Sequence, residues 1–189
     1  MVNNYPILIA SMGRVGSTLM TNVISKITND VKFINLDNNI ILKNGVLYKT
    51  HSFSNQMPLK TNCKVIYLFG NPMNIVISAH KYTNIKLHYK HMNADVRNIN
   101  KWHIYDSLRL EDNFDSWYKK QNFDLITVRY ETMYNNLSKI EEFINHKLEF
   151  PKYKKRRTNW LEHPHKELLQ KTYGNLNKKI LNAKDIKIW

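Results

Sequence analysis

The sequence has little cysteine and no long apolar run. Its single cysteine, Cys63, cannot form an internal disulfide or a cysteine-based zinc cluster, and this usage fits a reducing compartment. No apolar run approaches the length needed to cross a bilayer. The start of the chain carries neither a basic segment nor an apolar run long enough for a signal peptide. We therefore expect a soluble, intracellular, cytoplasmic protein without a membrane-spanning segment.

Acidic residues are scarce relative to basic ones. The chain has 29 Lys and Arg against 15 Asp and Glu, which gives a formal net charge of +14. Such a balance favours an anionic partner: a nucleic acid, an acidic membrane surface, or a small molecule that carries phosphate or sulfate. Charge alone does not choose among these, and part of the excess is lysine in an Asn- and Ile-rich chain, a bias that an AT-rich genome also produces.

Internal repeats, low-complexity tracts and linkers rich in Pro, Gly or Ser are also missing. Hydrophobic residues make up 42% of the chain and aromatic residues 12%, which is typical of a folded protein rather than a disordered one. With 189 residues, the sequence predicts one domain over residues 1–189.

Short apolar segments alternate with segments of helical periodicity. The apolar segments are Tyr5–Ser11, Val31–Leu36, Gly45–Thr50, Lys64–Phe69 and Asp124–Tyr130. The first and fourth are nearly continuous hydrophobics, as in strands buried on both faces of a parallel sheet. Helical periodicity runs over Gly16–Thr28, Pro72–Tyr89, Trp102–Lys120, Glu131–His146 and Pro164–Ala183. The alternation predicts a three-layer α/β fold with a central parallel sheet of about five strands flanked by helices.

A glycine-containing turn, Met12–Thr18, follows the first apolar segment. Glycines permit tight turns, successive N–H groups can converge on an anion, and the next helix N-terminus adds partial positive charge. The nucleotide P-loop pattern G-x-x-x-x-G-K-[ST] is not met, because Ser11 takes the place of the first glycine and Ser17 that of the lysine. An enzyme that uses Mg-ATP is therefore disfavoured, and a simple tight turn is the alternative.

Polar residues follow later strands too, and ligands in such sheets bind beyond the carboxyl ends of the strands. Lys49 and His51 end the third strand, Ser78 lies about two turns into the helix after the fourth, and the fifth ends in Arg129–Glu131. A lone histidine is more often structural than catalytic. Beside a lysine and near an anion-binding turn, however, His51 could reach a hydroxyl nucleophile.

Together and in this order, these segments resemble the sulfotransferases that use 3′-phosphoadenosine 5′-phosphosulfate (PAPS) and have a P-loop-like fold. Arg14–Thr18 is similar to the family's [KR]-S-G-[ST]-T loop, and Lys49–His51 matches its K-T-H motif. Gly70–Ser78 corresponds to R-N-P-x-D-x-x-x-S, and Arg129–Thr132 to [FR]-Y-E-D. The similarity covers residues 5 to about 134 and suggests a short, divergent member of the family.

The resemblance implies that PAPS donates a sulfuryl group to a hydroxyl by in-line displacement, with PAP as product and no metal. It implies catalytic roles for three residues. His51 is the general base, since imidazole has an ordinary pKa near 6.5; Lys49 bridges the sulfuryl oxygens and the leaving phosphate; Arg14 neutralises that phosphate. The implied cofactor-binding residues are Arg14, Val15, Gly16, Ser17, Thr18, Leu19, Ser78, Tyr130, Arg156 and Arg157.

The third motif departs from the family pattern. Gly70 replaces an arginine that contacts the 3′-phosphate of the cofactor, and Asn74 replaces an aspartate. Loss of a charge-assisted contact to phosphate costs about 1.5–3 kcal/mol, enough to weaken binding tenfold or more. The basic run Lys152–Arg157 is a candidate substitute, because the family places a late basic segment over the same phosphate. A solvated charged surface is the alternative.

Histidines do not form a recognisable metal site in the sequence. His80, His88 and His91 fall on one predicted helix, but no carboxylate pair completes a ligand set. His163 and His165 are similarly unsupported as ligands. We therefore expect no metal.

Three functions stay open at this point. The first is a PAPS-dependent sulfotransferase that acts on a hydroxyl of a small molecule, a carbohydrate or a protein. The second is a catalytically impaired protein of the same fold that binds PAPS, PAP or another nucleotide. The third is a basic nucleic-acid-binding protein, motivated by the net charge and by Lys152–Arg157. The sequence specifies neither the acceptor nor the oligomeric state.

Overall fold

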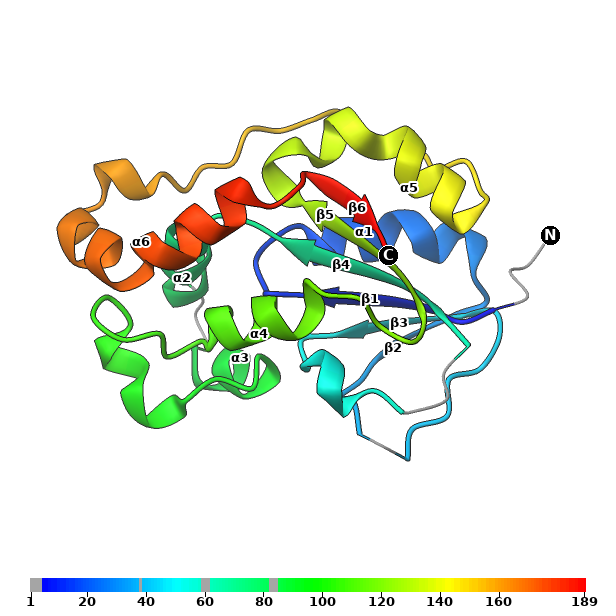
Figure 1. Ribbon diagram of the computed structural model, residues 1–189, viewed down its shortest axis with the longest axis horizontal. Coiled ribbons are helices and arrows are strands. Elements are labelled where there is room, and N and C mark those ends of the chain that lie inside the picture. Colours follow the sequence, from blue (N-terminus) through cyan, green and yellow to red (C-terminus); the bar gives the residue numbers. More distant parts are fainter. Residues whose placement is uncertain (1–4, 38, 59–61, 82–84) are drawn as a thin grey trace.

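The computed structural model describes residues 5–37, 39–58, 62–81 and 85–189, with only the backbone described at 87 and 88. Within these residues one sheet has the strand order β2-β3-β1-β4-β5-β6 (Figure 1). Neighbours from β2 through β5 pair in parallel, and β6 is antiparallel to β5. The strands are β1 (Ile7–Ser11), β2 (Asp30–Phe33), β3 (Val46–Thr50), β4 (Lys64–Phe69), β5 (Asp124–Arg129) and β6 (Ile186–Ile188).

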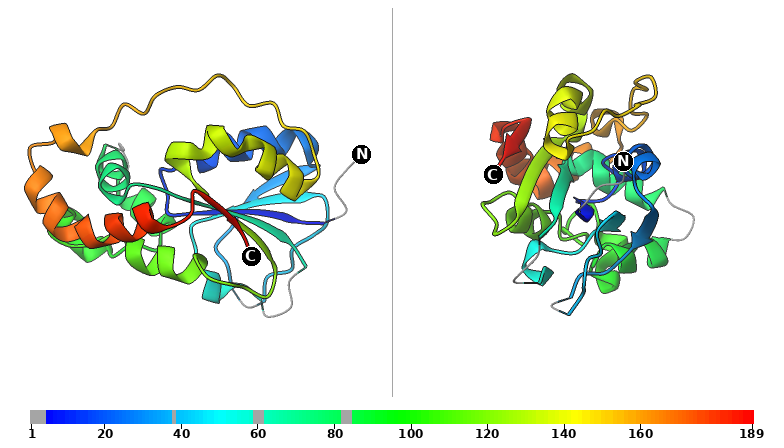
Figure 2. Two further views of the ribbon diagram at one scale, coloured as in Figure 1. Left: turned by 45° about the horizontal axis from the view of Figure 1, so that its top comes forward. Right: turned by 90° about the vertical axis from the view of Figure 1, so that its right-hand side faces the viewer.

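Helices cover both faces of this sheet, so the predicted α/β fold class is confirmed. Helices α1 and α5 lie on one face and α4 lies on the other (Figure 2). Among the described residues, no helix is long and apolar enough to cross a membrane. The helices are α1 (Ser17–Ile24), α2 (Pro72–His80), α3 (Ile85–His91), α4 (Leu110–Trp117), α5 (Leu137–Ile144) and α6 (Lys166–Asn182).

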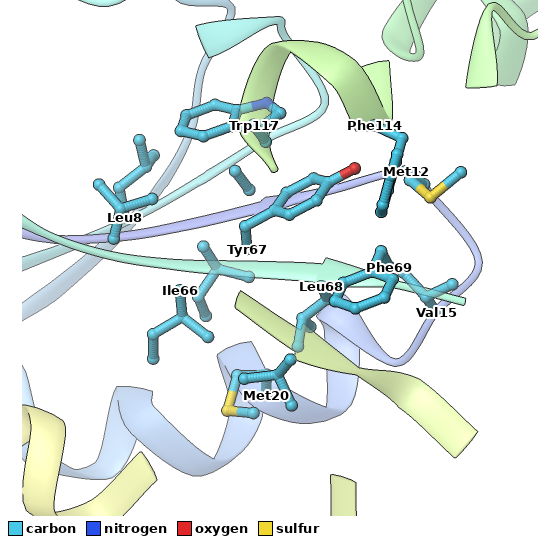
Figure 3. Packing of buried hydrophobic residues seen from close by; sticks show 14 of the residues in the cluster. Leu8, Met12, Val15, Met20, Ile66, Tyr67, Leu68, Phe69, Phe114 and Trp117 are labelled. Carbon is cyan, nitrogen blue, oxygen red and sulfur yellow. The ribbon is translucent and has the colours of Figure 1, made fainter. Parts of the chain in front are cut away.

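The central strands β1 and β4 are buried on both faces, as their continuous apolar sequences predict. Figure 3 shows the two layers that cover β4: Met20 of α1 lies on one side, and Phe114 and Trp117 of α4 lie on the other. The ring of Tyr67 stacks on Trp117 with the centroids 5.7 Å apart, and its hydroxyl donates to Oδ1 of Asn113 at 3.0 Å. This packing fixes α4 against the sheet.

Several predicted helices were too long. The helix predicted over Trp102–Lys120 begins only at Leu110, because the Asp106 carboxylate accepts a hydrogen bond from the backbone N–H of Glu111 at 3.1 Å and caps the first turn. The helix predicted over Glu131–His146 starts as a 3-10 helix and becomes α-helical at α5. Apolar periodicity does not reveal such boundaries, because it continues across them.

The helix predicted over Pro72–Tyr89 is represented by α2 and α3, and residues 82–84 of that prediction lie outside the described residues. Strand β6 was not predicted at all. It is three residues long, too short for a periodic signal, and it exists by pairing with β5 through Val128 and Ile186.

Candidate active site

A cavity of about 800 Å³ lies at the carboxyl ends of the parallel strands. The segments that follow β1, β2 and β3 line it, together with α2, Tyr130 and residues 154–158. Among the described residues no Asp or Glu lines it, whereas its six Lys and Arg residues are Arg14, Lys49, Lys154, Lys155, Arg156 and Arg157. This one-sided charge makes the cavity a site for an anion.

The turn between β1 and α1 is held in left-handed backbone conformations. Gly13, Arg14 and Gly16 have φ angles of 79°, 53° and 78°. A Cβ atom at Gly16 would come within 2.8 Å of the ring of Tyr130, so this position requires glycine for both its conformation and its neighbour. Gly16 also has no side chain to cap α1. The first amide groups of α1 can therefore donate to an anion in the cavity.

Cations and hydroxyls from three elements meet beside this turn. Nε of Arg14 donates to Oγ of Ser78 in α2 at 3.2 Å, and Nζ of Lys49 in β3 donates to Oγ1 of Thr18 at 2.9 Å. Burial, and then the positive charge of Arg14, lower the pKa of Lys49. An anion bound beside Lys49 would favour its ammonium form and so raise this pKa again.

His51 lies at the end of β3 and lines the same cavity. Its Nδ1 is 2.9 Å from Oγ and 3.1 Å from the carbonyl oxygen of Ser11, the last residue of β1. Its own carbonyl oxygen accepts a hydrogen bond from Nδ2 of Asn113 in α4 at 3.2 Å. The sequence did not predict either contact. The only signal was that Ser11 replaces a glycine of the nucleotide P-loop pattern.

Residues 151–159, called here the basic segment, form the extended second part of the connection between α5 and the 3-10 helix Trp160–Glu162 (Figure 1). Nη2 of Arg156 donates to the carbonyl oxygen of Asn74 at 2.9 Å, and the guanidinium lies 5.5 Å from the ring centroid of Tyr130. The backbone N–H of Trp160 donates to Oδ1 of Asn74 at 2.9 Å. Asn74 therefore fastens the basic segment to α2.

Arg156 carries a donor that the described residues leave unused. Its Nη1 is buried and has no hydrogen-bond partner among them. Burial lowers the pKa of Arg156, and the carboxylate of Glu131 opposes that shift. Because a buried donor without an acceptor is costly, an anionic ligand in the cavity is the natural partner.

The structure explains why residue 70 is a glycine. A Cβ atom there would lie 3.0 Å from both carboxylate oxygens of Glu131 and 3.2 Å from a methyl group of Val15. Oε1 of Glu131 accepts a hydrogen bond from the backbone N–H of Asn71 at 2.9 Å, which holds the carboxylate in this position. A side chain at residue 70 would require Glu131 and Val15 to move by a few tenths of an ångström, so the local packing favours glycine there. Arg156 is a partly buried residue whose guanidinium reaches the cavity.

Most of the predicted site residues line this one cavity. They are Arg14, Gly16, Ser17, Thr18, Lys49, His51, Ser78, Tyr130, Arg156 and Arg157. Val15 and Leu19 are exceptions: Val15 is fully buried and Leu19 packs against the hydrophobic core. Their side chains pack toward the sheet, so a contact of these two residues with a cofactor would come from their backbone, and their predicted part in cofactor binding stays a prediction. Phe33, Ile34, Asn35, Thr50 and His91 also line the cavity and were not predicted.

The histidines considered as metal ligands lie in different surroundings. His80 stacks on Trp102 and contacts the hydroxyl of Tyr89, and His91 lines the cavity. The side chain of His88 lies outside the described residues. Within the part of the chain that the structure describes, no group of three or more His, Cys, Asp or Glu residues could hold a metal ion.

Comparison of the sequence with family models and with curated proteins finds no match. The structure is similar to the crystal structure of the mouse sulfotransferase SULT7A1 complexed with PAP, with a TM-score of 0.50 and 18% sequence identity. The alignment covers 77% of this chain and 61% of that sulfotransferase chain, which is less than two thirds of its length. At this identity the likeness concerns the fold, and this chain has the α/β fold of a sulfotransferase.

Proposed function

We propose that this protein is a PAPS-dependent sulfotransferase that transfers a sulfuryl group to a hydroxyl of an acceptor. The observation that carries the proposal is the meeting of Arg14, Lys49 and His51 in one cavity, beside the turn that presents the amides of α1. The likeness in fold to a PAP-bound sulfotransferase supports the same choice.

The residues of the cavity fit PAPS, which has a phosphosulfate at its 5′ end and a phosphate at its 3′ position. The turn amides, Arg14 and Lys49 suit the 5′ group, because they place backbone donors and two cations together. Ser78 and Arg156 suit the 3′-phosphate, and the unused buried Nη1 of Arg156 is the donor that such a phosphate needs. In this assignment Arg156 provides the contact to the 3′-phosphate that the family's arginine makes at the position of Gly70.

PAPS supplies a sulfuryl group attached to a phosphate leaving group. His51 accepts the proton that the acceptor hydroxyl loses as its oxygen forms a bond to sulfur. Arg14 and Lys49 balance the negative charge that stays on the phosphate oxygen when its bond to sulfur breaks. The turn amides hold the reacting groups in line, and such positioning supplies much of the rate enhancement, as in phosphoryl transfer.

The decisive experiment is a calorimetric titration of the purified protein with PAP, with adenosine 5′-phosphate as the matched ligand that lacks the 3′-phosphate. We expect saturable binding of PAP and weaker binding of adenosine 5′-phosphate. Absence of PAP binding rejects the proposal. Transfer of labelled sulfate from PAPS to any member of a pooled set of metabolites and glycans then separates an active enzyme from a protein that only binds the nucleotide.

A salt titration distinguishes this proposal from nucleic-acid binding. The lysines of the basic segment are exposed, as the nucleic-acid hypothesis requires. Binding of a polyanion weakens steeply with ionic strength, because condensed counterions are released, whereas a preformed cofactor cavity responds less. As salt is raised from 50 to about 200 mM, we expect the affinity for PAP to fall less than the affinity for single- or double-stranded DNA.

A further inference from the structure

Ser11 connects the two halves of the proposed site. It is fully buried at the end of β1, and its Oγ accepts a hydrogen bond from the backbone N–H of Gly13 in the turn at 3.3 Å. The same Oγ lies 2.9 Å from Nδ1 of His51. Because β1 and β3 pair in parallel, with Ala10 opposite Thr50, the next residues of the two strands are neighbours. One serine therefore contacts both the anion-binding turn and the proposed base.

The contacts of His51 select one arrangement of its ring protons. Nδ1 lies 3.1 Å from the carbonyl oxygen of Ser11, and a carbonyl oxygen only accepts hydrogen bonds. Nδ1 must therefore carry the proton for this contact to be favourable, and its N–H is then shared with Oγ of Ser11. A neutral ring with hydrogen on Nδ1 has its lone pair on Nε2. Nε2 is then the nitrogen that can accept a proton.

We propose that Ser11 is a positioning residue that holds His51 in the Nδ1–H tautomer, with Nε2 as the proton acceptor, and ties the ring orientation to the turn. The catalytic consequence rests on the proposed function, whereas the tautomer is a property of the unliganded chain. The backbone of His51 is fixed independently by Asn113, so the contribution of Ser11 is to the ring. A glycine at position 11, as in the nucleotide P-loop pattern, would keep the carbonyl oxygen that accepts the Nδ1–H, but it would lack the hydroxyl that ties the ring to the turn.

Other charged groups face the same cavity and set the background for any titration of His51. Within the described part of the chain they are Arg14 from the turn, Lys49 from β3, His91 from α3, and Lys154, Lys155, Arg156 and Arg157 from the basic segment. None of these side chains changes in a Ser11 variant. A change in His51 that follows substitution of Ser11 is therefore assigned to the lost hydroxyl.

The tautomer can be measured without knowledge of the acceptor. In ¹⁵N-histidine-labelled full-length protein, the imidazole ¹⁵N resonances distinguish Nδ1–H from Nε2–H, and loss of one spin system in His51→Gln assigns His51. We expect the Nδ1–H form in the wild type, in Ser11→Ala and in Ser11→Thr, because all three keep the carbonyl oxygen of residue 11. Because Ser11→Ala lacks the hydroxyl, we expect its His51 Nδ1–H to exchange with water faster than in the wild type, and Ser11→Thr to exchange at the wild-type rate. Ser107→Ala is the matched control, because Ser107 is also fully buried but contacts Tyr89 outside the cavity.

The Nε2–H form in the wild type overturns the proposal, and this result does not depend on the folding of any variant. An unchanged exchange rate of the His51 Nδ1–H in a folded Ser11→Ala, even with a lowered melting temperature, overturns the part given to the hydroxyl, because it leaves that hydroxyl a structural role only. Wild-type protein that fails to bind PAP rejects the proposed function and leaves the tautomer measurement to decide on Ser11.

Once an acceptor is known, the rate of sulfuryl transfer provides a second test of the proposal. We expect Ser11→Ala to lower kcat about tenfold, with the dissociation constant of PAP changed less than about threefold. Ser11→Thr restores kcat. A loss of PAP affinity that matches the loss of kcat would overturn the positioning role, because Ser11 would then act on the turn alone.

Discussion

The cavity has two walls that are built in different ways. The wall at the strand ends carries Arg14, Lys49 and His51, and the pairing of β1 with β3 places these residues. The other wall is the basic segment, which is held to Asn74 by a hydrogen bond from Arg156 and by one from Trp160, the residue that follows the segment. A sheet holds groups within fractions of an ångström, whereas a tethered segment supplies charge with an adjustable position. The difference suits chemistry at the first wall and binding at the second.

We expect the largest effect on turnover from substitution of His51, the proposed general base. We expect His51→Ala to lower kcat for sulfuryl transfer by about 10²–10⁴-fold, the usual contribution of a general base, with the affinity for PAP nearly unchanged. His146→Ala, a histidine outside the cavity, is the control. An alanine variant with normal turnover would show that the strand-end wall binds ligand without a proton acceptor at residue 51.

The turn should be the next most sensitive point. Gly16→Ala adds a methyl group within 2.8 Å of Tyr130 to a backbone with a φ of 78°. The left-handed conformation alone costs about 1–2 kcal/mol, so we expect a larger loss of stability than this and at least tenfold weaker PAP binding. Gly45→Ala is the matched control, because Gly45 has a φ of 73° outside the cavity. If both variants lower stability and calorimetric PAP affinity equally, Gly16 serves the turn conformation only and has no special role in PAP binding.

A smaller effect is expected at the second wall. Arg156→Gln removes the guanidinium with the buried Nη1 and should weaken PAP binding about tenfold, in line with about 1.5 kcal/mol for a charge-assisted hydrogen bond. Arg157→Gln, a change in an exposed neighbour, should weaken it less than threefold. Binding of adenosine 5′-phosphate should be the same in all three proteins. If Arg156→Gln affects both ligands equally, Arg156 does not serve the 3′-phosphate.

The smallest effect is a pH dependence of binding at Lys49. The folded chain lowers the pKa of Lys49 below 10.5 by burial and by Arg14, so the unliganded protein gains stability as pH rises toward that ordinary value. An anion favours the ammonium form. PAP binding should therefore take up protons in the alkaline range, and the affinity should fall a few-fold there.

Calorimetry in buffers of different ionisation enthalpy measures this proton uptake. Lys49→Arg should abolish it, because arginine stays charged, whereas Lys26→Arg at the surface should not. Uptake that is unchanged in Lys49→Arg would place the titrating group elsewhere in the cavity.

Much of the fold could be predicted from apolar patterning. The segments that became β1 and β4 are nearly continuous hydrophobics, and their burial on both faces follows from that pattern. Strand β6 and the start of α4 could not be predicted in this way. The first depends on pairing with β5, and the second depends on a cap from Asp106, a residue outside the helix.

The candidate site was predictable where local motifs follow strands, because parallel strands bring their carboxyl ends to one edge. That rule accounts for the meeting of the Arg14 turn with Lys49 and His51. The outward or inward direction of each side chain was not predictable. Val15 and Leu19 belong to the same motif and point into the core, since burial of apolar surface decides their orientation.

The sequence by itself determined the α/β architecture and the edge of the sheet where a ligand should bind, because both follow from the order of the apolar and helical segments. Only the tertiary structure decided that Ser11 contacts His51, that Glu131 occupies the space beside Gly70, and that the guanidinium of Arg156 lies over the ring of Tyr130. Ser11 and His51, for example, are 40 positions apart in the chain. A hydrogen bond or a filled volume between such distant residues leaves no periodic pattern in the sequence.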